Sequence, residues 1–140
     1  QNNCFILGKD KAEAIAQEAA LKIKEISYIH AEGYSSSSLK HGPFALLEPD
    51  FPVILIAPND EHYAKSMNAY EEIQSRHAMI IIITDDSECD KPNHIKIPLN
   101  QTYRAMLSII PLQLLSYELS LSRGVNPDMP RNLAKVVTVE

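Results

Sequence analysis

The chain has 140 residues, a length that suits one domain, and 45% of them are hydrophobic, which is enough for a real core. Its formal net charge of -5, without a basic run, argues against nucleic acid as the main partner. Because the sequence has neither a bilayer-spanning apolar run nor a signal-peptide pattern, no membrane association is expected. Cys4 and Cys89 are the only cysteines and lie in unlike contexts, which favours a reduced, cytoplasmic setting. The chain begins with Gln1 instead of Met, which suggests a piece of a longer protein.

The first half of the chain predicts a strand, a turn and a helix. The short apolar run at residues 3–7 indicates a buried strand, and Gly8 ends it in a turn. The helix that follows has one stripe of apolar residues spaced by three and four, namely Ala12, Ile15, Ala16, Ala19, Ile23 and Ile26. Ala14, Leu21 and Tyr28 lie on nearly the opposite side, so we expect this helix to be covered on two sides.

The second half of the chain continues the alternation of strands and helices. Strands are predicted at residues 51–57, at 79–83 in the interior of the sheet and at 94–97 on its edge. Helices are predicted at 61–76 and 103–123. The alternation favours an α/β fold, a three-layer αβα sandwich with a parallel sheet flanked by helices, as in flavodoxin-like proteins.

The helix at 103–123 is the longest predicted element. Pro111 should kink or break it, and Gly124 reads as its C-terminal cap. Its apolar stripe consists of Met106, Ile109, Ile110, Leu114, Tyr117 and Leu121. The tail after it, with the apolar run 136–139, is expected to dock against the domain instead of fraying.

A lysine, a carboxylate and a histidine gather around the end of the first helix. Lys22 and Glu25 are three residues apart, and we expect Glu25 to be partly desolvated. The pair is either a proton-transfer group with its support or an intrahelical ion pair worth roughly 0.2–0.5 kcal/mol. His41 stands in a turn stiffened by Gly42 and Pro43, where an imidazole can serve as acid or base.

Three other polar features are interpreted without assigning them a ligand or a catalytic role. The serine run at 35–38 could bind an anion, but a helix N-cap in a polar loop explains it better. The polar residues 84–87 are interpreted as a solvated loop, since a third oxygen ligand for Mg²⁺ is missing. His30, His62, His77 and His94 have no metal-ligand spacing, so a metal site is not expected.

Several segments resemble the isomerase part of the glucosamine-6-phosphate synthase family, a sugar isomerase (SIS) domain. The similarity is carried by Ala20-Leu21-Lys22-Ile23-Lys24-Glu25-Ile26-Ser27-Tyr28-Ile29-His30-Ala31-Glu32, by Leu39-Lys40-His41-Gly42-Pro43 and by Pro130-Arg131-Asn132-Leu133-Ala134-Lys135. The ending Val137-Thr138-Val139-Glu140 also resembles the end of that enzyme. Two positions depart from the family pattern. Family members tend to have Gly-Arg-Gly where this chain has Gly8-Lys9-Asp10, and Ala and Gly-Glu where it has the serines at 35–38.

The resemblance implies a role for each matching residue. Glu25 moves a proton between the first two sugar carbons, and Lys22 supports Glu25 or hydrogen-bonds the sugar. His41 helps to open the sugar ring. Lys135 is the amine that condenses with the sugar ketone, and Ala134 and Lys135 lie at the substrate. Neither a metal nor an organic cofactor is implied.

The resemblance also implies a substrate and partners. Fructose 6-phosphate is converted to glucosamine 6-phosphate, with the amine nitrogen supplied by glutamine. Residues 1–123 form the second SIS domain, without its first helix, and residues 124–140 form a tail that closes over the sugar. The first SIS domain and the glutaminase domain are absent from these 140 residues, so little or no synthase activity is expected of them alone. A homodimer is expected, because His41 then reaches the neighbouring subunit's site.

Two alternatives from other functional classes remain open. The chain could be a sugar-phosphate-binding regulatory module without catalysis. It could also be a different enzyme of the same fold, such as a deglycase or a ketose–aldose isomerase, against which the tail at 130–135 argues.

Overall fold

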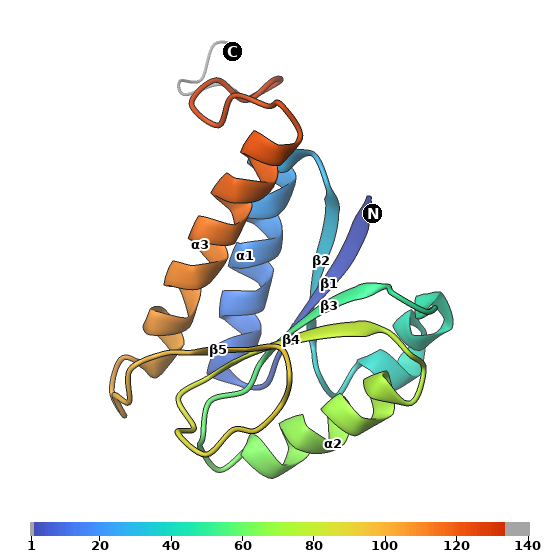
Figure 1. The fold of residues 1–140 in the computed structure, drawn as a ribbon, viewed down its shortest axis with the longest axis vertical. Helices are drawn as coiled ribbons and strands as arrows, with labels where there is room; N and C mark the ends of the chain where they lie inside the picture. The colour runs from blue at the N-terminus through green and yellow to red at the C-terminus, as the bar shows by residue number, and fades with distance from the viewer. Residues whose placement is uncertain (1, 134–140) are drawn as a thin grey trace, which may run out of the picture.

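Five parallel strands form one sheet at the centre of the molecule (Figure 1). This structure is a computed structural model, and it describes residues 2–133. The strands lie in the order β2-β1-β3-β4-β5. In chain order they are β1 (Asn3–Gly8), β2 (His30–Ser35), β3 (Pro52–Ile56), β4 (Met79–Thr84) and β5 (His94–Lys96).

Helices cover the sheet on both faces, which confirms the predicted three-layer αβα architecture. They are α1 (Lys11–Ser27), α2 (Tyr63–Gln74), α3 (Arg104–Ser122) and the short 3-10 helices η1 (Leu39–His41) and η2 (Pro43–Leu46). In Figure 1, α1 and α3 lie on one side of the sheet, while α2, η1 and η2 lie on the other. Each face has its own hydrophobic core.

The interior strands are the ones that the sequence predicted most clearly. The all-apolar run of β4 pairs with β3 on one side and β5 on the other, as expected for a strand buried on both faces. The predicted edge strand at 94–97 is confirmed as β5. Sequence analysis missed β2, which is the other edge strand. Its residues are polar or only half-buried apart from Ala31, so the segment lacks an apolar run.

Two glycines let α1 lie directly on the strands. A Cβ atom on Gly33 of β2 would stand 2.6 Å from the backbone of Gln17, and one on Gly8 would stand 2.1 Å from the carbonyl oxygen of Ala12. The facing side of α1 is correspondingly small, with buried Ala12, Ala16, Ala19 and Ala20. The backbone of the helix therefore lies so close to β1 and β2 that any residue larger than glycine at positions 8 and 33 would clash with it.

The side of α1 that carries Ala14 and Leu21 is left uncovered by the residues that the structure describes. Leu21 is 42% exposed and Ala14 is exposed, so the expected cover on the second side is not present within residues 2–133. The same side carries Lys22 and Glu25, which are half-buried.

The apolar stripe of α3 lies on the outer surface and not in the core. Met106, Ile110, Leu114, Tyr117 and Leu121 are all at least 45% exposed, and of the predicted stripe only Ile109 packs against the core. The buried side of α3 is instead formed by Ser108, Leu112, Ser116 and Ser120. Three of these residues are serines, and their polar side chains gave no sign of burial in the sequence. Their hydroxyls donate to carbonyls three or four residues back in the same helix, so each hydroxyl has a hydrogen-bond partner within the core.

Pro111 lies inside α3, which continues unbroken from Arg104 to Ser122. The predicted cap is confirmed, because Gly124 has a left-handed backbone and its N–H donates to Leu121 while that of Val125 donates to Ser120. Sequence analysis expected no bilayer-spanning apolar run, but by length and composition alone α3 is long and apolar enough to cross a membrane, which for a single helix is weak evidence. Its serine face packs along α1.

The loop after β4 is not the solvated loop that the sequence suggested. Asp85 is buried, its Oδ1 accepts the backbone N–H of Asn59 at 2.6 Å, and its Oδ2 lies 3.5 Å from Nε of Arg104. Arg104 in turn donates to the carbonyl of Asn59 at 2.7 Å. Asp85 therefore ties the loops after β3 and β4 to the start of α3.

Substituting Gly33 tests the close approach of α1 to the sheet. Gly33→Ala should lower the free energy of unfolding by about 1–3 kcal/mol or more, because the added methyl meets helix backbone that cannot rotate away. Gly124→Ala is the matched control, since its methyl would meet nothing within 4 Å and only its φ of +67° opposes the change, at about 1–2 kcal/mol. Urea unfolding of both variants measures the difference, and a Gly33→Ala chain as stable as the parent would contradict the packing.

Candidate active site

Lys22 and Glu25 form an ion pair on the outward side of α1. Lys22 Nζ donates to Glu25 Oε2 at 2.7 Å and lies 3.6 Å from Glu18 Oε1. The Glu25 side chain is 27% exposed, which confirms the expected partial desolvation. The hydrogen bond to Glu25 is the main reason that the pKa of Lys22 is raised above its ordinary value. Lys22 therefore stays a cation at neutral pH and can donate hydrogen bonds but cannot act as a base.

Tyr28 ends α1 in a left-handed conformation, with φ of 59°. Glycine is the usual residue at such a position, so a tyrosine there is unfavourable unless its side chain makes compensating contacts. Those contacts are with the tail. The Tyr28 hydroxyl accepts the backbone N–H of Arg131 at 2.8 Å, and the Arg131 guanidinium stands 4.1 Å above the ring. The tail is thereby held at the end of α1, one helical turn from Glu25.

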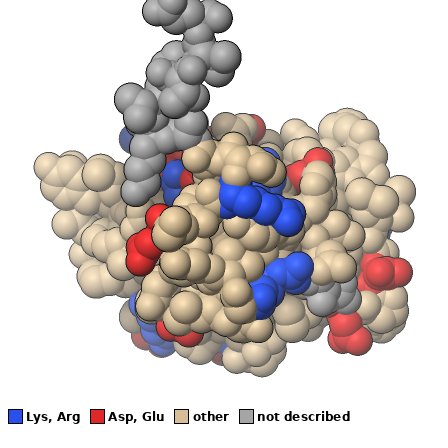
Figure 2. Space-filling model, turned by 90° about the horizontal axis from the view of Figure 1, so that it is seen from above, with Lys and Arg blue, Asp and Glu red and all other residues tan. Residues whose placement is uncertain are grey.

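A second contact fixes the base of the tail. Arg123, the last residue before Gly124, donates from Nη1 to Asn2 Oδ1 at 3.2 Å. The tail thus leaves α3 beside the start of β1 and crosses to the end of α1. Figure 2 looks down on this end of the molecule, where basic and acidic side chains are scattered over a largely uncharged surface.

His41 lies on the other side of the sheet from Glu25. It ends η1, which is anchored by the buried Leu39 in the core shared with α2, whereas Glu25 belongs to the α1 face. Lys40 pairs with Glu72 of α2 at 2.6 Å, and the His41 side chain is exposed. A single chain therefore does not bring Glu25 and His41 to one substrate.

Ala134, Lys135 and the apolar run at 136–139 lie outside the described residues, so their predicted roles stay predictions. Leu133, the last described residue, follows Arg131 by two positions. Within residues 2–133 there is no group of three or more His, Cys, Asp or Glu side chains that could hold a metal ion.

The serine run at 35–38 is divided between two elements. Ser35 is the last residue of β2, and Ser38 precedes η1 without a side-chain capping hydrogen bond, so the N-cap interpretation is wrong in that respect. Ser37 accepts a hydrogen bond from Lys9, which follows β1. Lys9 and Ser37 thus bridge the carboxyl ends of β1 and β2.

A polar crevice of about 290 Å³ lies beyond the carboxyl ends of β1 and β3. After β1 the chain continues to β2 at one edge of the sheet, and after β3 it continues to β4 toward the other edge. Doubly wound folds bind ligands at such a point, between the two strands where the direction changes. Asp10, Asp60, His62 and Arg104 are among the residues that line it. Their mixed charge is unlike a dedicated phosphate cradle, which needs a surplus of donors.

Comparison with known proteins places the chain in a family. Residues 1–123 match the SIS domain family. The chain belongs to the SIS domain family. The match ends where α3 ends, so the tail that contacts Tyr28 lies beyond it.

The SIS domain is similar over its whole length to much longer proteins. It is 58% identical to the "Probable glutamine--fructose-6-phosphate aminotransferase [isomerizing]" of Acanthamoeba polyphaga mimivirus, covering 100% of this chain and 23% of that protein. It is 48% identical to the glutamine–fructose-6-phosphate aminotransferase of Chlorobaculum tepidum, covering 99% of this chain and 23% of that one. The chain thus spans about a quarter of the length of these relatives.

Solved structures agree with the fold of the SIS domain. The C-terminal domain of glucosamine-fructose-6-phosphate aminotransferase from Francisella tularensis superposes with a TM-score of 0.81 at 35% identity, covering 92% of this chain and 38% of that one. Glucosamine-6-phosphate deaminase from Thermotoga maritima gives 0.80 at 28% identity, covering 98% and 40%.

Tyr28 is the residue that sequence reasoning missed here. Its place at the end of an apolar side of α1 gave no signal of a contact with the tail, because that contact joins residues 103 positions apart. Asp85 was missed for the same reason, since its partners Asn59 and Arg104 come from other loops.

Replacing Tyr28 with phenylalanine tests the contact with the tail. Tyr28→Phe keeps the ring under Arg131 but removes the acceptor of its N–H, which should cost roughly 0.5–1.5 kcal/mol of local stability. Amide exchange at Arg131 should then speed up by a factor of about two to ten. Tyr117→Phe, which changes an exposed tyrosine on α3, is the control. Unchanged exchange at Arg131 in Tyr28→Phe would show that the hydrogen bond does not hold the tail.

Proposed function

We propose that this SIS domain is the C-terminal sugar-isomerase part of a longer glutamine–fructose-6-phosphate aminotransferase. The identities of 43–58% over the whole chain to three proteins of that name support the assignment. The observation that supports the local chemistry is the contact of the tail with Tyr28, because Arg131, four residues before Lys135, contacts the end of α1 that carries Lys22 and Glu25.

The reaction converts fructose 6-phosphate and an amine nitrogen from glutamine into glucosamine 6-phosphate. The Lys135 amine attacks the ketone carbon at C2 and forms an imine with loss of water, after which ammonia displaces the lysine. Glu25 then takes a proton from C1 and returns it to C2, while the proton of the C1 hydroxyl passes to the imine nitrogen, which leaves an aldehyde at C1 and an amine at C2. A carboxylate suits this step because one group takes and returns the proton without moving.

The cation at Lys22 has a supporting role in this scheme. Since its pKa is raised by Glu25, it stays protonated and hydrogen-bonds Glu25 or the sugar. The substrate contact of the tail is assigned to Ala134 and Lys135. Residues 1–123 form the domain and residues 124–140 the closing tail.

His41 opens the sugar ring in a site other than that of its own chain. It lies on the α2 face, away from Glu25, and its side chain is exposed. A homodimer in which His41 reaches the neighbouring subunit's Glu25 satisfies both facts. The remaining partners are the first SIS domain and the glutaminase domain of the parent chain, in a cytoplasmic enzyme. Neither nucleic acid nor a membrane takes part.

A charge-neutral substitution tests the role of Glu25. In the full-length enzyme Glu25→Gln should lower the rate of glucosamine 6-phosphate formation from fructose 6-phosphate and ammonia by a factor on the order of 10²–10⁴. Glu18→Gln is the control, because Glu18 lies on the same helix and also faces Lys22 but is 47% exposed. A regulatory module without catalysis would show changed affinity alone, and equal rates in the two variants would refute the assignment of Glu25.

Borohydride reduction tests the covalent step. It should trap radiolabelled fructose 6-phosphate on Lys135 of the full-length enzyme, and Lys135→Ala should lose the label. Lys24→Ala, which changes an exposed lysine of α1, should keep it. Trapping that survives in Lys135→Ala would end the assignment, and a product assay on several sugar phosphates would then separate a deglycase from a ketose–aldose isomerase.

A further inference from the structure

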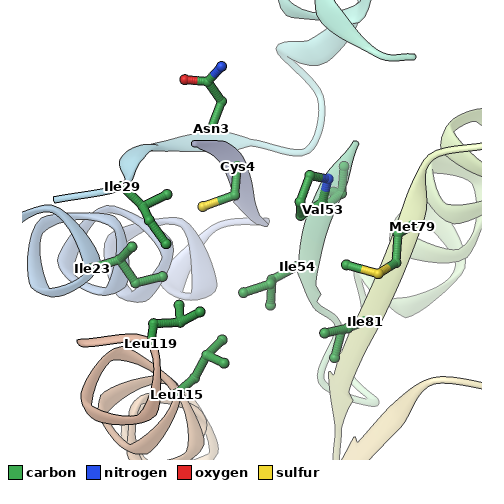
Figure 3. Close-up of a pocket in the computed structure, with 11 residues that line it drawn as sticks. Asn3, Cys4, Ile23, Ile29, Val53, Ile54, Met79, Ile81, Leu115 and Leu119 are labelled. Carbon is green, nitrogen blue, oxygen red and sulfur yellow. The ribbon is translucent and has the colours of Figure 1, made fainter. Parts of the chain in front are cut away.

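Two pockets of similar size, about 260 Å³ each, lie on opposite faces of the sheet. The pocket on the face of α1 and α3 is apolar (Figure 3). Leu115 and Leu119 of α3 project toward Ile54 and Ile81 across it, and none of the described residues that line it is charged. It therefore has no group that would select a particular ligand. The pocket on the α2 face is different, because polar and charged side chains line it.

This second pocket, which we name the serine pocket, lies between α2 and the segment that follows β2. It is lined by Ser36, Ser37 and Lys40 on one side and by Lys65, Asn68 and Glu72 of α2 on the other. Pockets for drug-sized ligands have volumes of roughly 300–1,000 Å³. The serine pocket is slightly smaller, so it suits a small ion or the polar head of a small metabolite.

Ser36 is the residue that points to a ligand. Only 6% of its surface is exposed, yet it lines the pocket. Its backbone N–H donates to the carbonyl of Gly8 at 2.8 Å, which holds it beside the end of β1. Its hydroxyl, in contrast, has no hydrogen-bond partner among residues 2–133. Hydroxyls so far withdrawn from bulk water are normally hydrogen-bonded, and a ligand in the pocket would supply the missing partner.

The charges around the serine pocket favour an anion. Lys40 Nζ pairs with Glu72 Oε1 at 2.6 Å, whereas no carboxylate of residues 2–133 pairs with Lys65. Lys9 donates to the Ser37 hydroxyl, which adds a third ammonium group and leaves the Ser37 proton free to be donated to a ligand. Three lysines thus stand against one glutamate, and the donors outnumber the acceptors.

We propose that the serine pocket binds a phosphate group, either as free inorganic phosphate or as the head of a small phosphate monoester. The hydroxyls of Ser36 and Ser37 and the ammonium groups of Lys40 and Lys65 would donate to its oxygens, and charge-assisted hydrogen bonds of this kind are the strong ones. A cation would meet the surplus of lysines, and a neutral ligand would leave that surplus without a counter-charge.

The serine pocket is separate from the residues of the proposed function and does not depend on it. Glu25 and Lys22 lie on α1, on the other face of the sheet. Lys40 does directly precede His41 in η1. A phosphate held by Lys40 would therefore also restrain the turn that carries the His41 imidazole.

Lysine acetylation in the full-length protein tests the proposal with inorganic phosphate as the probe. The protein is treated with an N-hydroxysuccinimide ester of acetic acid, with phosphate or with sodium chloride of equal ionic strength, and each lysine is followed by peptide mass spectrometry. Phosphate at ten times its half-protecting concentration should slow the acetylation of Lys65 by about tenfold, because only about a tenth of the sites are then free. Lys24, an exposed lysine of α1, should react at the same rate in both solutions.

Variants connect the protection to the serine pocket. Ser36→Ala should raise the half-protecting concentration about tenfold, because it removes a donor to a charged group. Glu72→Gln should lower it by a few-fold, because it removes the one negative charge that lines the pocket. Ser87→Ala, which changes an exposed serine after β4, is the control and should leave it unchanged.

Glycerol 3-phosphate identifies the form of the ligand. A half-protecting concentration below that of inorganic phosphate would support a phosphate monoester, and an equal or higher one would support the free ion. Equal acetylation of Lys65 in phosphate and in chloride would overturn the proposal, as would protection that is the same in Ser36→Ala and Ser87→Ala. Since the readout is chemical modification, a protein without synthase activity but with phosphate-protected Lys65 would refute the proposed function and leave this site standing.

Discussion

The close contact between α1 and the two strands beside it is the constraint on which the rest of the structure depends. Gly33 and Gly8 remove the side chains that would hold the helix away, and the alanines of α1 complete a flat contact surface. The outward side of the helix is thereby fixed in direction. Lys22 and Glu25 are presented at a defined place, and Tyr28 stands where the tail arrives.

The parts of the fold that could be predicted from sequence are those with strong local signals. The apolar run of β4, the alanine and isoleucine spacing of α1 and the cap at Gly124 each determine their own element. β2 could not be predicted in this way, because an edge strand with one buried residue gives no apolar run. β2 is defined by its pairing with β1 along six positions, which is a tertiary interaction and not a local sequence signal.

Periodicity showed that α3 has an apolar stripe but not which way it faces. Serines satisfied by their own helix carbonyls cost little inside a core, so the serine face could be buried while the larger apolar side chains stayed outside. The sequence of α3 therefore contains two distinct sides, a serine side that packs on the core and a side of large apolar residues that is exposed. The site was predicted with the same limits: Glu25 and Lys22 pair within one helix and could be found from spacing, whereas Tyr28 and Asp85 act through distant segments.

The position of His41 bears on what a functional unit must contain. The sheet separates it from Glu25, and both the core around Leu39 that anchors η1 and the core beneath α1 consist of buried apolar side chains. Bringing the two side chains together within one chain would require one of these cores to open, at a cost of many buried apolar contacts. Association of a second chain requires no such change, because His41 is exposed and Glu25 lies on the outward side of α1. If both residues act on one sugar, the chemistry therefore belongs to an assembly and not to a single SIS domain.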